Sequence, residues 1–162
     1  MQLIDMDIKN NLKMKNPDDK LVFGKRLADY HFTKFDKSHR SGFRYWYNHW
    51  KAFNLTALAL GAWKLKYLFH DWEKPWLMIL WNRDYKRVQK WHRTHNPHHF
   101  GYRNAPNYDY EAMVVDWECS RFTKLAAQKN AREHAEEEIE THPERRTFIE
   151  SGIYPVLTRY GL

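Results

Sequence analysis

The chain has 162 residues, a net charge of +7, an aromatic fraction of 17% and a single cysteine. This length is enough to bury one hydrophobic core without disulfides, and the lone cysteine, Cys119, excludes an intramolecular disulfide and is typical of a reducing compartment. We interpret Cys119 as a small packed residue on a helix rather than a nucleophile, because no Cys-His signature surrounds it.

No segment has the pattern of a secretory signal or a membrane span. Acidic residues interrupt the apolar run of the first nine residues, MQLIDMDIK, and the longest apolar stretch, residues 55–63, is far too short to cross a bilayer. We therefore expect a soluble, cytoplasmic protein with no membrane partner.

The positive charge is distributed unevenly along the chain. Residues 1–105 hold 20 Lys and Arg against 9 Asp and Glu, whereas residues 106–162 hold 7 against 11. A basic body of this kind can steer a phosphate-bearing ligand towards the protein. An equally good interpretation is a solvated surface that keeps the protein soluble, because the positive residues are scattered rather than clustered.

Helical periodicity covers most of the chain, and no alternating run predicts a strand, so we expect an all-α fold. Residues 1–18 predict an extended arm and residues 20–37 a first helix, so residues 1–40 form an N-terminal arm and accessory helix. Ser41 can cap a helix over residues 42–62. One inner face of that helix carries residues at steps of three or four, namely Trp46, His49, Phe53, Ala57 and Leu60.

Further elements are predicted in the middle of the chain. A helical stretch from Trp63 ends near His70 and Asp71, and Pro75 suits the first turn of a helix that runs to about Arg93. Gly, Pro and Asn between residues 101 and 108 predict a loop.

Towards the C-terminus, Asp109 can cap the helix that carries Asp116. An amphipathic helix is predicted over residues 124–141, and Pro143 begins a short last helix. The tail from Gly152 is expected to be ordered only by docking.

Four residues with the side chains of metal ligands occur in the order His49, His70-Asp71 and Asp116, on separate predicted helices. Imidazole nitrogen and carboxylate oxygen hold divalent metals when distant parts of a chain bring them together. A single inward histidine is most often an ordinary core residue. Asp116 is harder to explain in that way, because a carboxylate among apolar residues needs a cation, either an arginine or a metal.

A second group of histidines lies in the sequence WHRTHNPHH. His95, His98 and His99 are candidate ligands, whereas His92 is the least favoured because it lies beside the predicted buried face of Trp91. The alternative interpretation is a polar loop whose histidines cap the end of a helix.

The set His49, H-D-x-x-K at residues 70–74 and Asp116 resembles the pattern of the HD-domain superfamily of metal-dependent phosphohydrolases. Together with N-P-H-H at residues 96–99 and E-x-M-V-x-D-W at residues 111–117, it is similar to an uncharacterised family of small bacterial and phage proteins. The resemblance implies an HD-like helical bundle over residues 41–162, in a bacterium or a phage-infected host.

The resemblance also implies a divalent metal, one of Mn, Fe, Zn, Co, Ni or Mg, held by His49, His70, Asp71 and Asp116. In some members of the superfamily two additional histidines hold a second ion, and here His95 with His98 or His99 would take those positions. One ion is the simpler expectation.

The reaction that the resemblance implies is hydrolysis of a small phosphorylated molecule, with a nucleotide as the expected substrate. Asp71 or Asp116 would orient the water, while Lys74 and one of His95, His98 or His99 would neutralise charge on the phosphoryl group. Lys74, Arg93 and Arg103 would bind substrate phosphates. The eight tryptophans could offer a stacking wall for a base, although a tryptophan-rich core is the favoured interpretation.

Two alternatives remain open from the sequence. A di-iron oxygenase would need all six ligands on the same scaffold. A basic helical module that binds nucleic acid or a partner protein would have a continuous positive surface and no deep pocket around His70 and Asp71.

Overall fold

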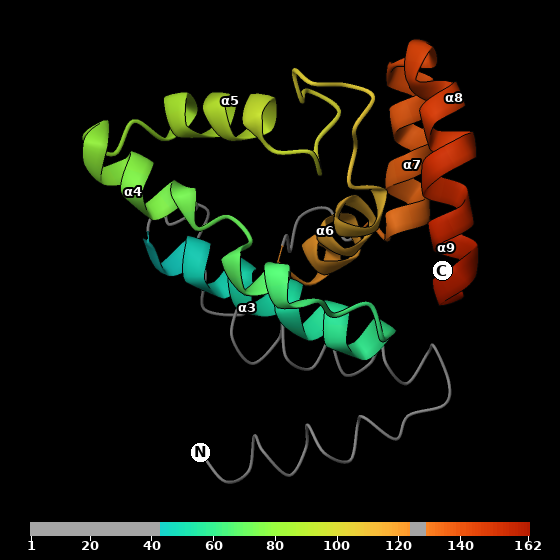
Figure 1. Ribbon diagram of the computed structural model, residues 1–162, viewed down its shortest axis with the longest axis horizontal. Coiled ribbons are helices and arrows are strands. Elements are labelled where there is room, and N and C mark those ends of the chain that lie inside the picture. The colour runs from blue at the N-terminus through green and yellow to red at the C-terminus, as the bar shows by residue number, and fades with distance from the viewer. Residues whose placement is uncertain (1–42, 124–128) are drawn as a thin grey trace, which may run out of the picture.

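The computed structural model describes residues 43–123 and 129–162, so the predicted arm, the accessory helix and the Ser41 cap lie outside the described residues. Within those ranges the structure is helical and contains no strand (Figure 1). The elements are α3 (Phe43–Leu60), η2 (Leu65–Phe69), α4 (Glu73–Leu80), α5 (Tyr85–His95), α6 (Tyr110–Thr123), α7 (Ala131–Thr141), η3 (Pro143–Arg145), α8 (Arg146–Phe148), η4 (Ile149–Ile153) and α9 (Tyr154–Tyr160).

Helix α3 buries the face that its sequence predicts. Phe53 and Ala57 are fully buried and Leu60 is nearly so. The helix ends at Leu60 because Gly61 adopts a left-handed conformation, with φ of 70°, that an L side chain rarely adopts. The helical stretch predicted from Trp63 is a 3₁₀ turn, η2, and not an α-helix.

The single helix predicted from Pro75 to Arg93 is wrong, because two helices occupy this segment. α4 ends at Leu80, and Asn82 and Arg83 then adopt left-handed φ angles of 47° and 63°. Asp84 caps α5 by accepting a hydrogen bond from the Arg87 amide at 3.1 Å. Helical spacing of apolar residues runs through this break, so the pattern alone did not reveal it.

Helix α6 lies between two hydrophobic clusters and packs against α3, α7, η4 and α9. Asp109 caps it as predicted, by accepting a hydrogen bond from the Ala112 amide at 3.2 Å. The first cluster joins α6 to α3 and η2 and contains Ala52, Phe53, Ala57, Leu60, Ala62, Tyr67, Ala112, Val115 and Cys119. The second joins α6 to the C-terminal helices and contains Met113, Val114, Ala131, Ala135, Ile139, Ile149, Ile153, Val156 and Leu157.

The C-terminal part of the chain is helical over more residues than the sequence predicted. α7 begins at Ala131, after a capping box formed by Asn130 and Glu133, so residues 129 and 130 do not belong to the predicted helix 124–141. From residue 146 to residue 160 the backbone is continuously helical, with one π-helical segment at η4. The tail from Gly152 is therefore part of a packed helix and not a docked irregular segment.

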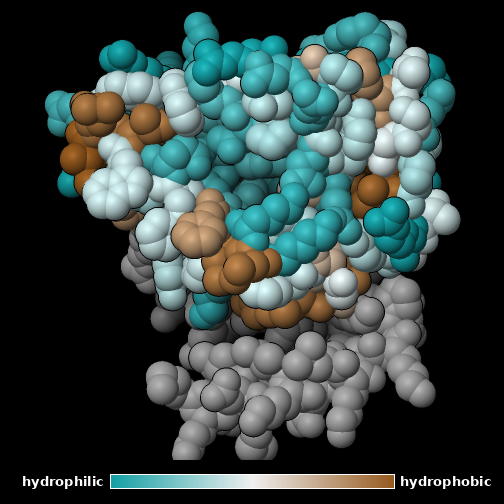
Figure 2. Space-filling model, in the orientation of Figure 1, coloured by the Kyte–Doolittle hydropathy of each residue, from teal (hydrophilic) through white to brown (hydrophobic). Residues whose placement is uncertain are grey.

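The predicted tryptophan-rich core does not form. All eight tryptophans lie in the described part of the chain, and none belongs to the buried core. Trp76 is 66% exposed, and Ile79 and Leu80 beside it are 63% and 72% exposed. Figure 2 shows hydrophobic residues gathered at this end of α4. No helix of the described residues is both long enough and apolar enough to cross a membrane.

We predict that Gly152→Ala destabilises the fold by about 1–3 kcal/mol, because a Cβ at residue 152 would lie 2.4–2.6 Å from ring atoms of Tyr110. Urea unfolding followed by circular dichroism measures the change. Ser151→Ala is the matched control, since Ser151 is exposed in the same π-helical segment and its replacement should change stability by less than about 0.5 kcal/mol. Equal stability of the two variants would contradict this packing argument.

Candidate metal centre

The structure brings together the four side chains of the HD-type set. The His49 Nε2 atom lies 3.4 Å from Asp71 Oδ2 and 3.0 Å from Asp116 Oδ1. The His70 Nε2 atom lies 3.5 Å from Asp71 Oδ1 and 3.9 Å from Asp116 Oδ1. His49 comes from α3, Asp116 from α6, and the His70-Asp71 pair from the turn between η2 and α4.

Helix α3 holds that turn in place. Asn54 donates a hydrogen bond to the Tyr67 carbonyl at 3.0 Å, and Trp50 donates one to the Leu68 carbonyl at 2.8 Å. The His70 ring stacks on Phe53 with 3.5 Å between ring centroids. Asp71 then takes a left-handed φ of 60°, which aspartate tolerates better than most residues and which is typical of functional turns.

A second group of histidines meets the same carboxylate. The His92 Nε2 atom lies 3.3 Å from Asp71 Oδ1 and 2.7 Å from His99 Nε2. The His98 Nε2 atom lies 3.5 Å from Asp71 Oδ1. Asp71 is therefore shared between the HD-type set and a trio formed by His92, His98 and His99.

His92, the least favoured histidine from the sequence, is 1% exposed at the middle of the cluster. His95, which the sequence analysis preferred, is not brought into it. The His95 ring stacks on Trp91 with 4.0 Å between centroids, and its Nδ1 atom lies 2.8 Å from the Trp91 carbonyl oxygen. These contacts hold the ring against its own helix.

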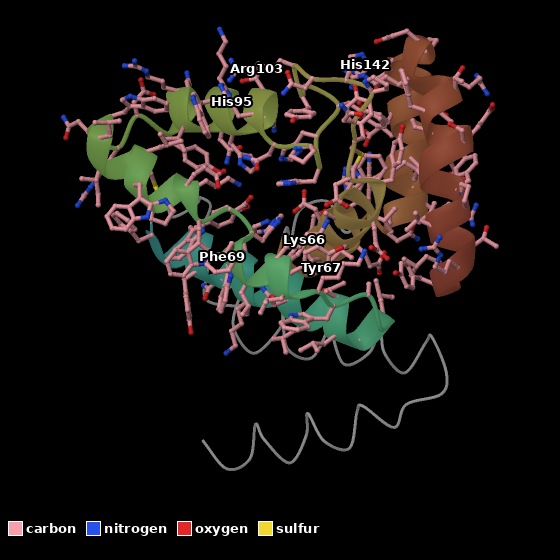
Figure 3. All side chains as sticks on the ribbon, in the orientation of Figure 1. Lys66, Tyr67, Phe69, His95, Arg103 and His142 are labelled. Atoms are coloured by element: carbon pink, nitrogen blue, oxygen red, sulfur yellow. The ribbon has the colours of Figure 1, made fainter. Side chains whose placement is uncertain are left out.

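The two arginines proposed as phosphate ligands are also outside the cluster. Arg93 and Arg103 are exposed. Figure 3 places Arg103 above α5, on the side of that helix away from α3. Neither guanidinium has an ion pair with the histidine and aspartate cluster among the described residues.

Glu73 is a site residue that the sequence analysis missed. One of its carboxylate oxygens, Oε1, contacts His92 Nδ1 and accepts a hydrogen bond from Asn96 Nδ2 at 2.9 Å. The available signal was its place two residues after Asp71, in the sequence HDWEK.

Cys119 also lies near the histidine and aspartate cluster, with its Sγ atom 3.9 Å from His49 Nδ1. It is buried in the first hydrophobic cluster, in agreement with its interpretation as a packed residue.

The protonation states of these groups suit metal ligands. Although burial raises the pKa of Asp71, nearby His70, His92 and Lys74 hold it well below its usual range, and His49 does the same for the pKa of Asp116. Burial lowers the pKa values of His70, His92 and His99, so their rings are neutral near pH 7. Ionised carboxylates and neutral imidazoles are the forms that bind a cation.

Three buried polar atoms of the cluster have no hydrogen-bond partner, namely His70 Nε2, Asp71 Oδ1 and His98 Nε2. Buried polar atoms are almost always paired, so unpaired atoms that face one another require an explanation. Ligands about 2.0–2.2 Å from one ion lie about 3–3.5 Å from each other. The two nitrogens are each 3.5 Å from Asp71 Oδ1, so these buried clusters could hold a metal ion.

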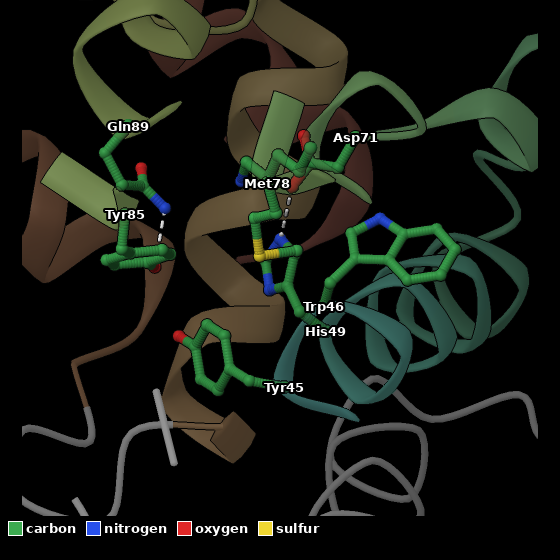
Figure 4. Close-up of a pocket in the computed structure, with 8 residues that line it drawn as sticks. Tyr45, Trp46, His49, Asp71, Met78, Tyr85 and Gln89 are labelled. Atoms are coloured by element: carbon green, nitrogen blue, oxygen red, sulfur yellow. Dashed lines mark hydrogen bonds and ion pairs between the residues drawn. The ribbon is translucent and has the colours of Figure 1, made fainter. Parts of the chain in front are cut away.

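A pocket opens beside His49 and Asp71, between α3, α4 and α5 (Figure 4). Its wall includes the Lys74 ammonium, which pairs with Asp71 Oδ2 at 2.5 Å, and its far side includes Gln89, which donates a hydrogen bond to the Tyr85 hydroxyl at 2.6 Å. The Lys74 side chain is only 12% exposed. The full lining is Tyr45, Trp46, His49, Asp71, Lys74, Met78, Tyr85 and Gln89.

Comparison of the chain with family models, with curated proteins and with solved structures finds no match in any of the three. The case for a metal centre therefore depends on the geometry of the cluster itself.

We predict that Asp71→Asn abolishes tight binding of divalent metal, because one carboxylate serves both groups of histidines and its amide replacement carries no charge. Elemental analysis of untagged protein measures metal per chain. The fold should persist by circular dichroism, since neither hydrophobic cluster contains Asp71. A folded variant that retains the wild-type metal content would remove Asp71 from the site.

We also predict opposite outcomes for two histidines of α5. His92→Ala should weaken metal binding by at least about tenfold, whereas His95→Ala should leave it unchanged, because only His92 faces Asp71. Calorimetric titration with Zn²⁺ measures both affinities. If only His95→Ala lost affinity for Zn²⁺, His95 and not His92 would be the ligand.

Proposed function

We propose that this protein is a metal-dependent phosphohydrolase that acts on a small phosphorylated molecule. The observation that carries the proposal is the position of Lys74, whose ammonium lies beside Asp71 in the wall of the pocket. An ammonium next to a cation site attracts an anion that bridges both, and a phosphate has the charge and the several oxygens needed to do so.

His49, His70, Asp71 and Asp116 would hold one divalent ion, and His92, His98 and His99 would share Asp71 to hold a second. A bound divalent ion of this kind lowers the pKa of its water and polarises a phosphoryl oxygen. Asp116 is 15% exposed at its side chain, in contrast to 1% for Asp71, so Asp116 is the carboxylate better able to orient an incoming water.

Lys74 would bind the phosphate and neutralise the charge that develops on it. Burial lowers the pKa of Lys74, but the Asp71 carboxylate and the hydrogen bond to it raise this pKa by more than burial lowers it, so the amine stays charged.

Three residues that the sequence placed in the reaction take no part in it, because they have no described contact with the cluster, namely His95, Arg93 and Arg103. Tyr45, Trp46 and Tyr85 line the pocket and would lie beside the organic part of a substrate bound there.

The activity is tested by phosphate release from a panel of phosphate monoesters and nucleotides, with the chelated protein reloaded with Mn²⁺, Co²⁺, Zn²⁺ or Mg²⁺. Release that depends on metal and disappears in Asp71→Asn supports the proposal. Protein that is loaded with metal but inactive on every phosphate compound would exclude phosphohydrolysis.

A di-iron oxygenase is the second candidate, and the observation that favours it is the shared Asp71 between two groups of histidines. Tightly bound iron and visible absorption of the purified protein would support it. The non-catalytic basic module is a further alternative, and binding of nucleic acid that falls steeply with salt would support it.

We predict that Lys74→Met lowers turnover of phosphorylated substrates about a hundredfold, because a phosphate contact in a partly enclosed site contributes about 2–3 kcal/mol. Metal stoichiometry should not change, since Lys74 has no ligand atom for the ion while its amine is charged. Lys86→Met removes an exposed lysine from α5 and is the control, with wild-type kinetics expected. Metal loss in Lys74→Met, or unaltered turnover, would refute this role.

A further inference from the structure

The two ring nitrogens of His92 have different surroundings. Nε2 faces inward, 3.3 Å from Asp71 Oδ1 and 2.7 Å from His99 Nε2. Nδ1 faces outward, in contact with Glu73 Oε1 and 2.9 Å from Asn96 Nδ2. Ligand atoms of Asp71, Glu73 and His92 lie within 4.8 Å of one another, but Glu73 Oε1 contacts Nδ1 whereas Asp71 Oδ1 faces Nε2. The contact of Glu73 with the cluster thus runs through the ring of His92.

The hydrogen bonds around Nδ1 determine which nitrogen carries the proton. The Asn96 amide has two hydrogens and two oxygen acceptors in reach, Glu73 Oε1 at 2.9 Å and the His92 carbonyl at 3.3 Å. A carboxylate can only accept. All these atoms are satisfied when Nδ1 carries the proton and donates it to Glu73, which leaves the lone pair of Nε2 directed at the cluster.

We propose that Glu73, steadied by Asn96, is a positioning residue that fixes His92 in the Nδ1-protonated tautomer required to bind the second metal ion. The inference rests on the proposed function in one respect, namely that the trio of His92, His98 and His99 holds an ion. Carboxylates that orient a metal-binding histidine in this way typically change metal affinity by about 10- to 100-fold.

The segment from Asp71 to Lys74, where the turn after η2 passes into α4, therefore supplies three groups within four residues. Asp71 offers the shared carboxylate, Glu73 orients the histidine from α5, and Lys74 faces the pocket. Glu73 is also in the first turn of α4, where the helix dipole favours a negative charge.

Glu73→Ala tests the proposal sharply, because it reverses the choice of tautomer. Without the carboxylate, Asn96 Nδ2 is left as the neighbour of Nδ1 and donates to it, so the proton moves to Nε2 and blocks the lone pair. The second ion should then bind about 10- to 100-fold more weakly, while the first ion keeps its affinity. The double variant Glu73→Ala/Asn96→Ala should regain part of the loss, because the competing donor is gone.

Calorimetric titration of the chelated full chain with Zn²⁺ measures the two affinities, and long-range ¹H–¹⁵N correlation spectra of ¹⁵N-histidine protein report the tautomer of His92 directly. Glu144→Ala is the matched control, since it removes a carboxylate 3.3 Å from His142 Nδ1, outside the described clusters, and should change neither quantity.

An unchanged second affinity in Glu73→Ala, no recovery in the double variant, or an Nε2-protonated His92 in the wild type would each overturn the proposal. A wild-type chain that binds only one ion would also overturn it. If the metal affinities change as expected but no phosphate compound is hydrolysed, the positioning role stands and the proposed reaction fails.

Discussion

The buried carboxylate of Asp71 is the group on which the arrangement of this protein depends. Its side chain is 1% exposed, and nitrogens of four imidazoles lie 3.3–3.5 Å from its two oxygens, those of His49, His70, His92 and His98. An unpaired carboxylate in such a place would cost several kcal/mol, roughly the full stability of a marginal domain. The Lys74 ammonium compensates this charge at Oδ2, and a cation held by the rings would compensate it at Oδ1, which has no hydrogen-bond partner.

Helix α6 shows how a polar centre can coexist with a small core. Its residues face the first hydrophobic cluster through Val115 and the second through Met113 and Val114. Asp116 occupies the remaining side, next to His49. A helix that is packed on most of its surface leaves few directions for its carboxylates, and α6 carries three, at Glu111, Asp116 and Glu118. The two clusters thus fix the direction of Asp116, and Cys119 of the first cluster lies with its Sγ atom 4.0 Å from Asp116 Oδ1.

The sequence predicted that His49, His70, Asp71 and Asp116 come together, because helical spacing ties His49 to Phe53 and an aspartate among valines requires a partner. It could not choose between His92 and His95. Both lie near the end of α5, and the difference between them comes from a ring stack with Trp91 that holds His95 away. The sequence also did not predict the break between α4 and α5, because apolar residues keep a helical spacing through it. The Asp84 side chain nevertheless begins a new helix there by accepting a hydrogen bond from the Arg87 amide.

The break between α4 and α5 also sets the distance across which Glu73 and His92 meet. They are 19 residues apart in sequence and in contact in space, whereas an unbroken helix would separate them by about 28 Å. A residue added to or removed from the turn would change how α5 lies against α4. Surface turns usually accept insertions and deletions. Here the length of the turn between Leu80 and Tyr85 is constrained by the contact between Glu73 and the buried His92. The turn residues themselves, 81–84, have no described contact with that histidine.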